Sequence, residues 1–269
     1  MIVTLCSTDI AWENKNENFK NMDSLLDSLT YKSDVIIFPE MFTTGFTMNT
    51  SLAENIEGPS FRWMQKTAAK YDAAVVASFP FREPAFNQNE EDHIYNRAFF
   101  VYPNGQYIYY DKRHLFRMAR ENGFYTAGKK QAVAEYKGVR FALNICYDIR
   151  FPIWSRNLNN QYDVLINIAN FPLSRVKIIA PLVKTRALEN TAYMAFVNRV
   201  GTDEDCEYIP SSMFVDYKGN NTGEEQLIPS KTANTNIQII KGEIELEKLK
   251  AFRVTFPVWL DADTFTINI

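Results

Sequence analysis

The chain has 269 residues, of which 46% are hydrophobic and 23% are charged, and its net charge is −3. This balance is typical of a globular protein that binds neither nucleic acid nor an anionic membrane surface. No apolar run is long enough for a membrane span, and the first ten residues lack the basic segment of a signal peptide. Three cysteines without paired spacing predict a protein of the reducing cytoplasm, and two histidines without a CxxC motif predict no metal site.

The first half of the chain predicts alternating strands and helices followed by a β-hairpin. The expected strands are 2–5, 35–38, 73–79, 93–101 and 106–110. Helices are expected at about 15–30 and from residue 58 onward, where Ser60 would cap the first turn. A polar surface loop is expected at 82–92, and a Pro-Asn-Gly turn would join the last two strands.

The second half opens with an irregular segment, 112–128, and such segments inside a compact domain are usually functional. The expected strands are 139–145, 164–168, 193–197 and 236–240, together with a hairpin of 213–217 and 226–228. The expected helices are 152–158, 173–191 and 244–252, and Pro181 would kink or interrupt the second of them. Because no linker or repeat divides the chain, we predict a single domain of the α/β class over residues 1–269.

Cys146 stands where an alternating strand stops and a run of charged, aromatic and proline residues begins. A strand that ends in a sharp turn exposes the side chain at its end, as the nucleophile elbow of serine hydrolases does. A free cysteine at the end of an apolar strand is, however, more often a small buried hydrophobe. Cys146 alone leaves both interpretations open.

Two further strand ends carry charged residues that could act with this cysteine. Glu40 follows an apolar strand, where a carboxylate is costly to ionise unless it is paired. Lys112 follows the predicted hairpin, and Glu121 lies in the irregular segment after it. The ordinary alternatives are a Glu40 that faces solvent and a Lys112 in a basic surface loop. Glu121 would then pair with Arg117 or Arg120 at the surface.

The sequence around these residues resembles the nitrilase superfamily of carbon–nitrogen hydrolases, and most of all its omega-amidase branch with the bacterial YafV-type proteins. The resemblance runs from the first strand to the FPVWLDAD segment near the end of the chain. Its motifs are PEMFTTGF at 39–46, DKRHLFRMA at 111–119, CYDIRFPIWSRN at 146–157, RALENTAY at 186–193 and NRVGTD at 198–203. Each motif alone is weak, but the five in this order specify the family.

The resemblance implies a fold and an assembly. The fold is a four-layer α-β-β-α sandwich of the nitrilase type, in which two sheets pack face to face between outer helices. The assembly is a homodimer or larger homo-oligomer that pairs through helices, without a metal or an organic cofactor. The family's Glu-Lys-Cys triad maps to Glu40, Lys112 and Cys146, and Glu121 matches a second glutamate between the lysine and the cysteine.

This mapping predicts the hydrolysis of an amide through a thioester. Glu40 would take the thiol proton, and Cys146 would attack a carboxamide carbon. The ammonium of Lys112 and the backbone N–H of Tyr147 would stabilise the oxyanion. Glu40 would then give the proton to departing ammonia and activate the water that hydrolyses the thioester. Glu121 would orient Lys112 or bond the substrate nitrogen.

The omega-amidase branch implies short α-keto dicarboxylate monoamides as substrates, such as α-ketoglutaramate and α-ketosuccinamate, and a place in the metabolism of deaminated glutamine. The free carboxylate of such a substrate calls for an arginine. The candidates are Arg117, Arg150 and Arg175, although Arg150 could instead hold a carboxylate of the fold. Tyr125 and Phe171 are expected to line the pocket.

The chain departs from the family pattern at two positions near the expected pocket. Phe171 stands where the family has tryptophan, and Pro181 stands within a predicted helix, so both bear on the substrate. Another branch of the superfamily is the enzymatic alternative: an N-carbamoyl hydrolase, an aliphatic amidase or a nitrilase. A catalytically silent binding protein on the same scaffold is the non-enzymatic alternative, against which the intact triad argues.

Overall fold

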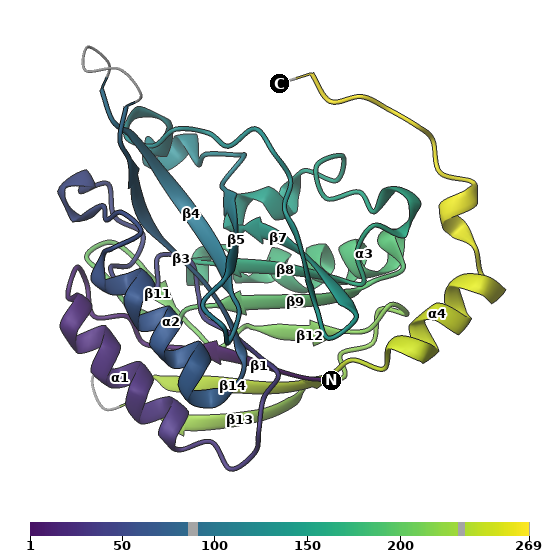
Figure 1. The fold of residues 1–269 in the computed structure, drawn as a ribbon, viewed down its shortest axis with the longest axis horizontal. Coiled ribbons are helices and arrows are strands. Elements are labelled where there is room, and N and C mark those ends of the chain that lie inside the picture. The colour runs from purple at the N-terminus through teal and green to yellow at the C-terminus, as the bar shows by residue number, and fades with distance from the viewer. Residues whose placement is uncertain (86–90, 231–234, 269) are drawn as a thin grey trace.

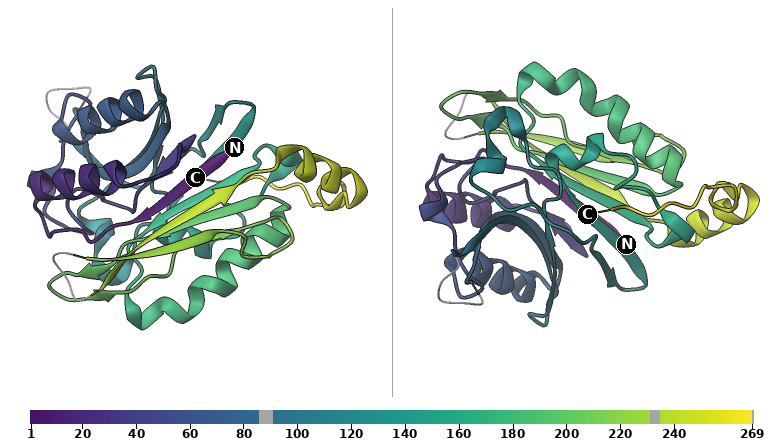
Figure 2. Two further views of the ribbon diagram at one scale, coloured as in Figure 1. Left: turned by 90° about the horizontal axis from the view of Figure 1, so that it is seen from below. Right: turned by 90° about the horizontal axis from the view of Figure 1, so that it is seen from above.

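The computed structural model describes residues 1–85, 91–230 and 235–268. Two β-sheets pack face to face, and helices cover the outer face of each sheet (Figure 1, Figure 2). The four-layer α-β-β-α sandwich expected from the family resemblance is therefore confirmed. None of the helices in the described ranges has the length and apolar character that a membrane crossing requires.

The larger sheet carries α1 (Lys15–Asp27) and α2 (Pro59–Tyr71) on its outer face. Its strands, in order across the sheet, are β13 (Glu224–Pro229), β14 (Asn236–Glu243), β1 (Ile2–Ser7), β2 (Val35–Ile37), β3 (Ala74–Glu83), β4 (His93–Val101) and β5 (Tyr107–Asp111). Strands β1, β2 and β3 are parallel, whereas β4 reverses and β5 reverses again. Strand β5 therefore runs in the direction of β3.

The smaller sheet carries α3 (Ile179–Asn190) on its outer face. Its strands, in order, are β12 (Met213–Val215), β9 (Tyr193–Asn198), β8 (Val164–Ala169), β7 (Val139–Ile145) and β6 (Val133–Tyr136). A ribbon of β10 (Gly201–Thr202) and β11 (Glu207–Tyr208) follows β9, and α4 (Leu246–Thr255) lies beyond the edge of the sandwich (Figure 1). Short 3-10 helices occur at Thr50–Leu52, Arg117–Ala119, Glu121–Gly123, Cys146–Arg150, Leu158–Asn160, Leu173–Ile178 and Val258–Leu260.

Apolar side chains on both faces of each sheet explain the four layers. In β2, Val35 and Ile37 enter the layer between the sheets, whereas Ile36 packs toward the helices of the larger sheet. In β8, Ile166 enters the same central layer, whereas Leu165 packs toward α3. Burying one such side chain contributes about 2 kcal/mol. Strands of this kind are stable only where both faces of their sheet are covered.

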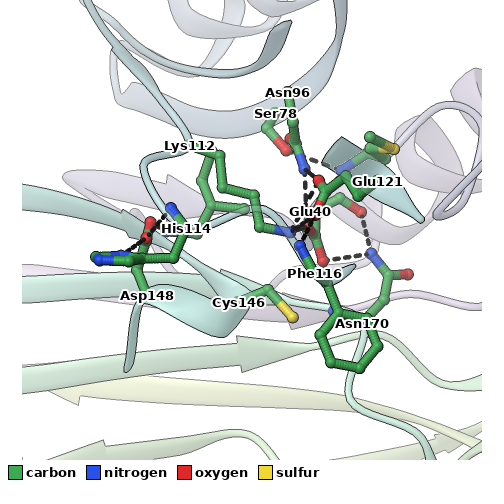
Figure 3. Close-up of polar contacts among 12 residues, drawn as sticks. Glu40, Ser78, Asn96, Lys112, His114, Phe116, Glu121, Cys146, Asp148 and Asn170 are labelled. Carbon is green, nitrogen blue, oxygen red and sulfur yellow. Dashed lines mark hydrogen bonds and ion pairs between the residues drawn. The ribbon is translucent and has the colours of Figure 1, made fainter. Parts of the chain in front are cut away.

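The order of the strands brings four chain segments together at one side of the sandwich. Glu40 follows β2 and Lys112 follows β5, both in the larger sheet, whereas Cys146 follows β7 and Asn170 follows β8 in the smaller sheet. Figure 3 shows these side chains converging between the two sheets. This convergence is what positions the candidate site.

The predicted hairpin of 213–217 and 226–228 is wrong. Strand β12 pairs with β9 in the smaller sheet, whereas β13 pairs with β14 in the larger one. The predicted turn exists, with Gly219 at a φ of +81°, but it carries the chain from one sheet to the other. A turn is encoded by its own residues, whereas the partner of a strand depends on which sheet offers an open edge.

The helix predicted at 152–158 is also wrong, because residues 152–155 form turns and a 3-10 helix begins only at Leu158. The amide of Asn157 donates to the main-chain oxygens of Tyr162 and Asn190, at 2.9 and 3.1 Å, and the hydroxyl of Tyr162 donates to the main-chain oxygen of Ser155. Bonds of this kind between side chains and the backbone compete with a helix.

Two further differences concern the starts of helices. The segment predicted as one helix at 173–191 is a 3-10 helix followed by α3, and Pro181 is the third residue of α3. It does not interrupt α3, because an N–H in the first turn has no helical partner to lose. Ser60 is not a cap, since Gly58 holds that position and the Ser60 hydroxyl donates to Glu54 at 2.8 Å.

Candidate active site

The ammonium of Lys112 lies between two carboxylates in the interior of the protein. Its Nζ is 2.7 Å from Oε1 of Glu40 and 3.0 Å from the carboxylate of Glu121, and all three side chains are completely buried. Burial by itself disfavours a charged lysine, but the charges of Glu121 and Glu40 outweigh it and raise the pKa of Lys112. Lys112 is therefore a cation at neutral pH, and the surface alternatives for these three residues are wrong.

Glu40 receives hydrogen bonds on both of its carboxylate oxygens (Figure 3). Oε1 accepts from the lysine ammonium and, at 2.8 Å, from Nδ2 of Asn96. Oε2 accepts from the main-chain N–H and from Nδ2 of Asn170, at 3.0 and 3.2 Å. The next residue, Met41, has a φ of +47°, and its N–H donates to Oγ of Ser78 at 2.9 Å. These contacts fix the direction of the Glu40 carboxylate.

Glu121 completes the buried cluster from the segment after β5. Its Oε2 accepts from the main-chain N–H of Phe116 at 2.6 Å, and its Oε1 accepts from Asn96 at 3.3 Å. Burial raises the pKa of Glu121, the Lys112 ammonium opposes the rise and the charge of Glu40 adds to it. Asn96 therefore bridges two carboxylates that both face one lysine.

Cys146 occupies a sharp turn between β7 and a 3-10 helix. Its φ is +45°, a left-handed conformation that costs a non-glycine residue about 1–2 kcal/mol. Asp148 braces the turn: its Oδ2 accepts from the N–H of Ile145 at 3.0 Å and from the hydroxyl of Tyr110 at 2.7 Å. Its Oδ1 accepts from the N–H of His114 at 2.9 Å. The predicted strand-turn-helix elbow is present and is tied to the segment that carries the lysine.

The thiol of Cys146 is free and adjoins the buried cluster. Burial raises its pKa well above the usual range, the charge of Glu40 adds to the rise, and the charge of Lys112 opposes it. The sulfur therefore keeps its proton at neutral pH and needs a base to become a nucleophile. Tyr147 is the second residue of the 3-10 helix, a position whose N–H has no partner within the helix.

A cavity of about 580 Å³ adjoins these groups, which is within the range of small-molecule sites. The predicted site residues on its wall are Glu40, Cys146, Tyr147, Arg150, Phe171 and Arg175. Across the described ranges, no three His, Cys, Asp or Glu side chains gather where they could hold a metal ion. The cavity is thus a place where a small molecule can reach the thiol.

Two predicted binding residues lie outside the lining of this cavity. Arg117 is exposed to solvent. Tyr125 is buried behind the wall, where its hydroxyl donates to the main-chain oxygen of Thr47 at 2.7 Å. Its ring packs in a cluster with Phe46 and Met48, which do line the cavity. Tyr125 therefore supports the wall instead of forming it.

Two arginines on the wall have no carboxylate partner among the described residues. Arg150 is exposed and forms no hydrogen bond or ion pair with them, so no carboxylate of the described fold holds it. The guanidinium of Arg175 lies 4.6 Å from the ring centre of Phe116. Both cationic groups therefore remain available to an anionic ligand.

Three residues that hold the site, Asn96, Asn170 and Asp148, were not predicted from the sequence. Asn96 had a detectable signal, because it interrupts a row of apolar residues, Ile94, Ala98 and Phe100, that alternate along one face of β4. Its contacts with two glutamates from distant segments had no such signal. Asp148 lies in the motif at 146–157 and Asn170 directly precedes Phe171, but their hydrogen bonds become visible only in the folded chain.

Comparison with known proteins relates this fold and cavity to one family. The sequence model of the carbon-nitrogen hydrolase family matches residues 2–253. The chain belongs to the carbon–nitrogen hydrolase family. This carbon–nitrogen hydrolase acts on carbon–nitrogen bonds other than peptide bonds, in linear amides.

Relatives of this carbon–nitrogen hydrolase match over almost its whole length. A protein of Yersinia enterocolitica named omega-amidase YafV is 37% identical over 266 residues, and the match covers 98% of both chains. The 2-oxoglutaramate amidase of Bacillus subtilis is 30% identical over 257 residues, which cover 94% of both chains. The crystal structure of XC1258 from Xanthomonas campestris, a CN-hydrolase superfamily protein with an arsenic adduct in its active site, has a TM-score of 0.88 at 31% identity and covers 100% of this chain and 99% of its own. The resemblance based on motifs is confirmed.

Proposed function

We propose that the protein is an omega-amidase that hydrolyses the terminal carboxamide of short α-keto dicarboxylate monoamides, such as α-ketoglutaramate and α-ketosuccinamate. The products are the keto acid and ammonia. The observation that carries this proposal is a thiol in a left-handed elbow, beside a buried Glu40–Lys112–Glu121 cluster, on a cavity that also holds two arginines without a carboxylate partner among the described residues. The names of two relatives, omega-amidase and 2-oxoglutaramate amidase, support the substrate class.

The first half of the reaction forms a thioester. Glu40 removes the thiol proton, and the sulfur of Cys146 attacks the amide carbon, so that a C–S bond forms and the carbonyl oxygen becomes an oxyanion. The ammonium of Lys112 and the N–H of Tyr147 donate to this oxygen, and each such donor stabilises the transition state by about 3 kcal/mol. The oxyanion then collapses, the C–N bond breaks, and the proton on Glu40 leaves with ammonia.

The second half releases the acid. Glu40, once more a carboxylate, takes a proton from a water molecule that attacks the thioester carbon. The C–S bond breaks, the keto acid departs and the thiol regains its proton. Glu121 keeps the Lys112 ammonium in place through both halves, which its 3.0 Å contact supports.

The free carboxylate of the substrate binds at the arginines of the wall. Arg150 follows Cys146 by four residues, and Arg175 lies in the 3-10 helix that follows β8. A guanidinium binds a carboxylate through two parallel hydrogen bonds, which fix orientation as well as charge. Phe171, which is 5% exposed and packs edge-on against Phe196, gives the cavity an apolar side.

The test is ammonia release from a panel of amides by the wild-type protein and by Cys146→Ala. The panel contains α-ketoglutaramate, α-ketosuccinamate, glutamine, an N-carbamoyl amino acid and a simple nitrile. We expect release from the two keto-amides alone and none from the variant. Faster turnover of the nitrile or of the N-carbamoyl compound would place the protein in another branch of the family, and no turnover of any compound would favour a binding protein.

We also propose that residues 1–269 form one domain, that the protein works in the cytoplasm and that it is a homodimer. One cluster of buried apolar residues between the sheets includes both Val3 and Leu249, which supports one domain. The three free cysteines support a reducing compartment. Apolar side chains exposed on helices, Leu188 at 50% and Val254 at 80%, support pairing through these helices. Light scattering after size exclusion should give the mass of a dimer, and a monomer at every concentration would contradict the pairing.

A further inference from the structure

Asn170 forms hydrogen bonds with both the main chain and the carboxylate of Glu40, the residue proposed as the base. Asn170 directly follows β8 and is 6% exposed. Its Nδ2 donates to the main-chain oxygen of Glu40 at 2.7 Å and to Oε2 of the same residue at 3.2 Å. Its main-chain N–H donates to Oε2 at 3.0 Å. Three hydrogen bonds from one residue therefore restrain the backbone and the carboxylate of Glu40.

The same residue also lies beside the nucleophile. Asn170 and Cys146 directly follow the neighbouring parallel strands β8 and β7, and both line the cavity next to Glu40 (Figure 3). Oε1 of Glu40 accepts from Lys112 and Asn96, whereas the two hydrogen bonds to Oε2 both come from Asn170. Asn170 is therefore the residue that orients the half of the carboxylate that Lys112 does not hold.

The base and the nucleophile belong to different sheets. Their alignment therefore depends on the contacts that join the two sheets. Glu40 extends from β2 in the larger sheet, whereas Cys146 and Asn170 extend from β7 and β8 in the smaller one. Met41 beside the base has a left-handed backbone, and strained positions of this kind persist only where neighbouring contacts fix them. The bonds from Asn170 cross from the smaller sheet to the larger one at this point.

We propose that Asn170 is a positioning residue that aligns Oε2 of Glu40 with the sulfur of Cys146 across the two sheets. In the first step the proton passes from sulfur to Oε2, and the negative charge passes from the carboxylate to the sulfur. The N–H of Asn170 donates to Oε2 and holds this oxygen in place before the transfer. Nδ2 keeps the carboxylate aimed at the thiol. This role rests on the proposed function of Glu40 and Cys146 in amide hydrolysis.

The test follows the alkylation of Cys146 by iodoacetamide, which needs no substrate, between about pH 6 and about pH 10. Peptide mass mapping separates Cys146 from Cys206, which also lines the cavity. In Asn170→Ala we expect alkylation at neutral pH to be about 100-fold slower than in the wild type, the scale of a lost general base. The deficit should shrink toward high pH, because hydroxide then removes the thiol proton in place of Glu40.

Asn157→Ala is the matched control. Asn157 is 4% exposed, and its amide also donates to two main-chain oxygens, but it lies outside the cavity. It should lose stability and keep the wild-type alkylation profile. An equal loss of alkylation in both variants, or a profile of Asn170→Ala parallel to the wild type at every pH, would overturn the proposal.

If Asn170→Ala does not fold, Asn170→Asp replaces the donor by an acceptor of the same shape. It should show the same deficit at neutral pH, and a wild-type profile in this variant would overturn the positioning role. With a keto-amide as substrate, kcat should fall in proportion to alkylation, while KM stays within about threefold because Asn170 acts through Glu40. A wild-type protein that hydrolyses no keto-amide, with the alkylation pattern unchanged, would refute the proposed substrate and leave the role of Asn170 standing.

Discussion

The buried cluster around Lys112 and the cavity wall around Arg150 and Arg175 differ in the number of contacts that fix their charged side chains. In the cluster, the lysine contacts two carboxylates and has no exposed surface. On the wall, Arg150 is exposed without a partner among the described residues, and Arg175 touches a ring and no carboxylate. Both regions lie on or next to the same cavity.

This difference separates the chemistry from the choice of substrate. Groups that must move a proton or stabilise an oxyanion work best when they are fixed before the substrate arrives, because no reorganisation is then needed. Groups that recognise the rest of the substrate can wait without a partner, because the ligand itself supplies one. We therefore expect changes in the cluster to lower kcat and changes in the wall to raise KM.

The largest effect is expected from Lys112→Met, which removes the cation of the cluster and keeps a side chain of similar length. Loss of an oxyanion donor lowers kcat by about 1,000-fold. The two carboxylates left unpaired in the interior lower the free energy of unfolding by about 3 kcal/mol. Steady-state ammonia release and urea unfolding measure the two quantities.

Lys129→Met is the control for this variant, because Lys129 is exposed on the segment that follows. It should change neither quantity. A Lys112→Met protein that raises KM and keeps its kcat would contradict the oxyanion role and would remove the difference between the two regions.

A smaller effect is expected from Arg150→Gln and Arg175→Gln on the wall. Loss of a hydrogen-bonded charge pair with the substrate carboxylate should raise KM by about 10- to 100-fold while kcat changes little. Arg117→Gln is the control, because Arg117 lies outside the lining. If only one of the two wall variants shows the effect, that arginine is the carboxylate ligand. If neither does, the account of substrate binding is wrong.

The strands and the triad of Glu40, Lys112 and Cys146 could be predicted from the sequence more accurately than the residues that line the cavity. Alternating apolar residues identify β7, and a wholly apolar run identifies β2, because a strand covered on both faces leaves such a pattern in its own residues. Glu40 and Cys146 were found because each ends such a strand. Tyr125 was misplaced because its position depends on the path of the irregular segment 112–128 across other strands.

The contacts that hold the site were the least predictable part. Asn96 and Asn170 come from strands in different sheets, and their hydrogen bonds to Glu40 join residues 56 and 130 positions apart. No local pattern of residues encodes a contact of that range. The same reason explains why the turn around Gly219 was found while the partners of β12 and β13 were not.

The smallest effect is expected for the stability at alkaline pH and involves Cys6, a buried thiol that does not line the cavity. Burial raises the pKa of Cys6 from 9.0 to about 12, so the unfolded chain loses this proton at lower pH than the folded protein does. The contribution of this thiol to the free energy of unfolding is fully present below the pKa of the unfolded chain, 9.0. It declines as the pH rises from 9.0 toward the pKa of the folded protein. The slope for this one group approaches about 1.4 kcal/mol per pH unit.

Cys6→Val, which has a similar volume and no ionisable group, should remove that part of the alkaline loss. Urea unfolding of both proteins between about pH 8 and about pH 10 measures the difference in slope. Parallel curves would contradict the raised pKa of Cys6. Iodoacetamide should label Cys146 in the native protein and leave Cys6 unmodified, because Cys146 lines the cavity whereas Cys6 is buried in the interior.

The central claim is that Cys146 becomes the acyl carrier because the fixed cluster removes its proton. The most direct measurement is the intact mass of the protein quenched with acid during turnover of α-ketoglutaramate. We predict an added mass equal to the acyl group of the substrate, located on the peptide that contains Cys146 and absent from Cys146→Ala. Turnover by Cys146→Ala at the wild-type rate, or an acyl group carried by another residue, would contradict the account.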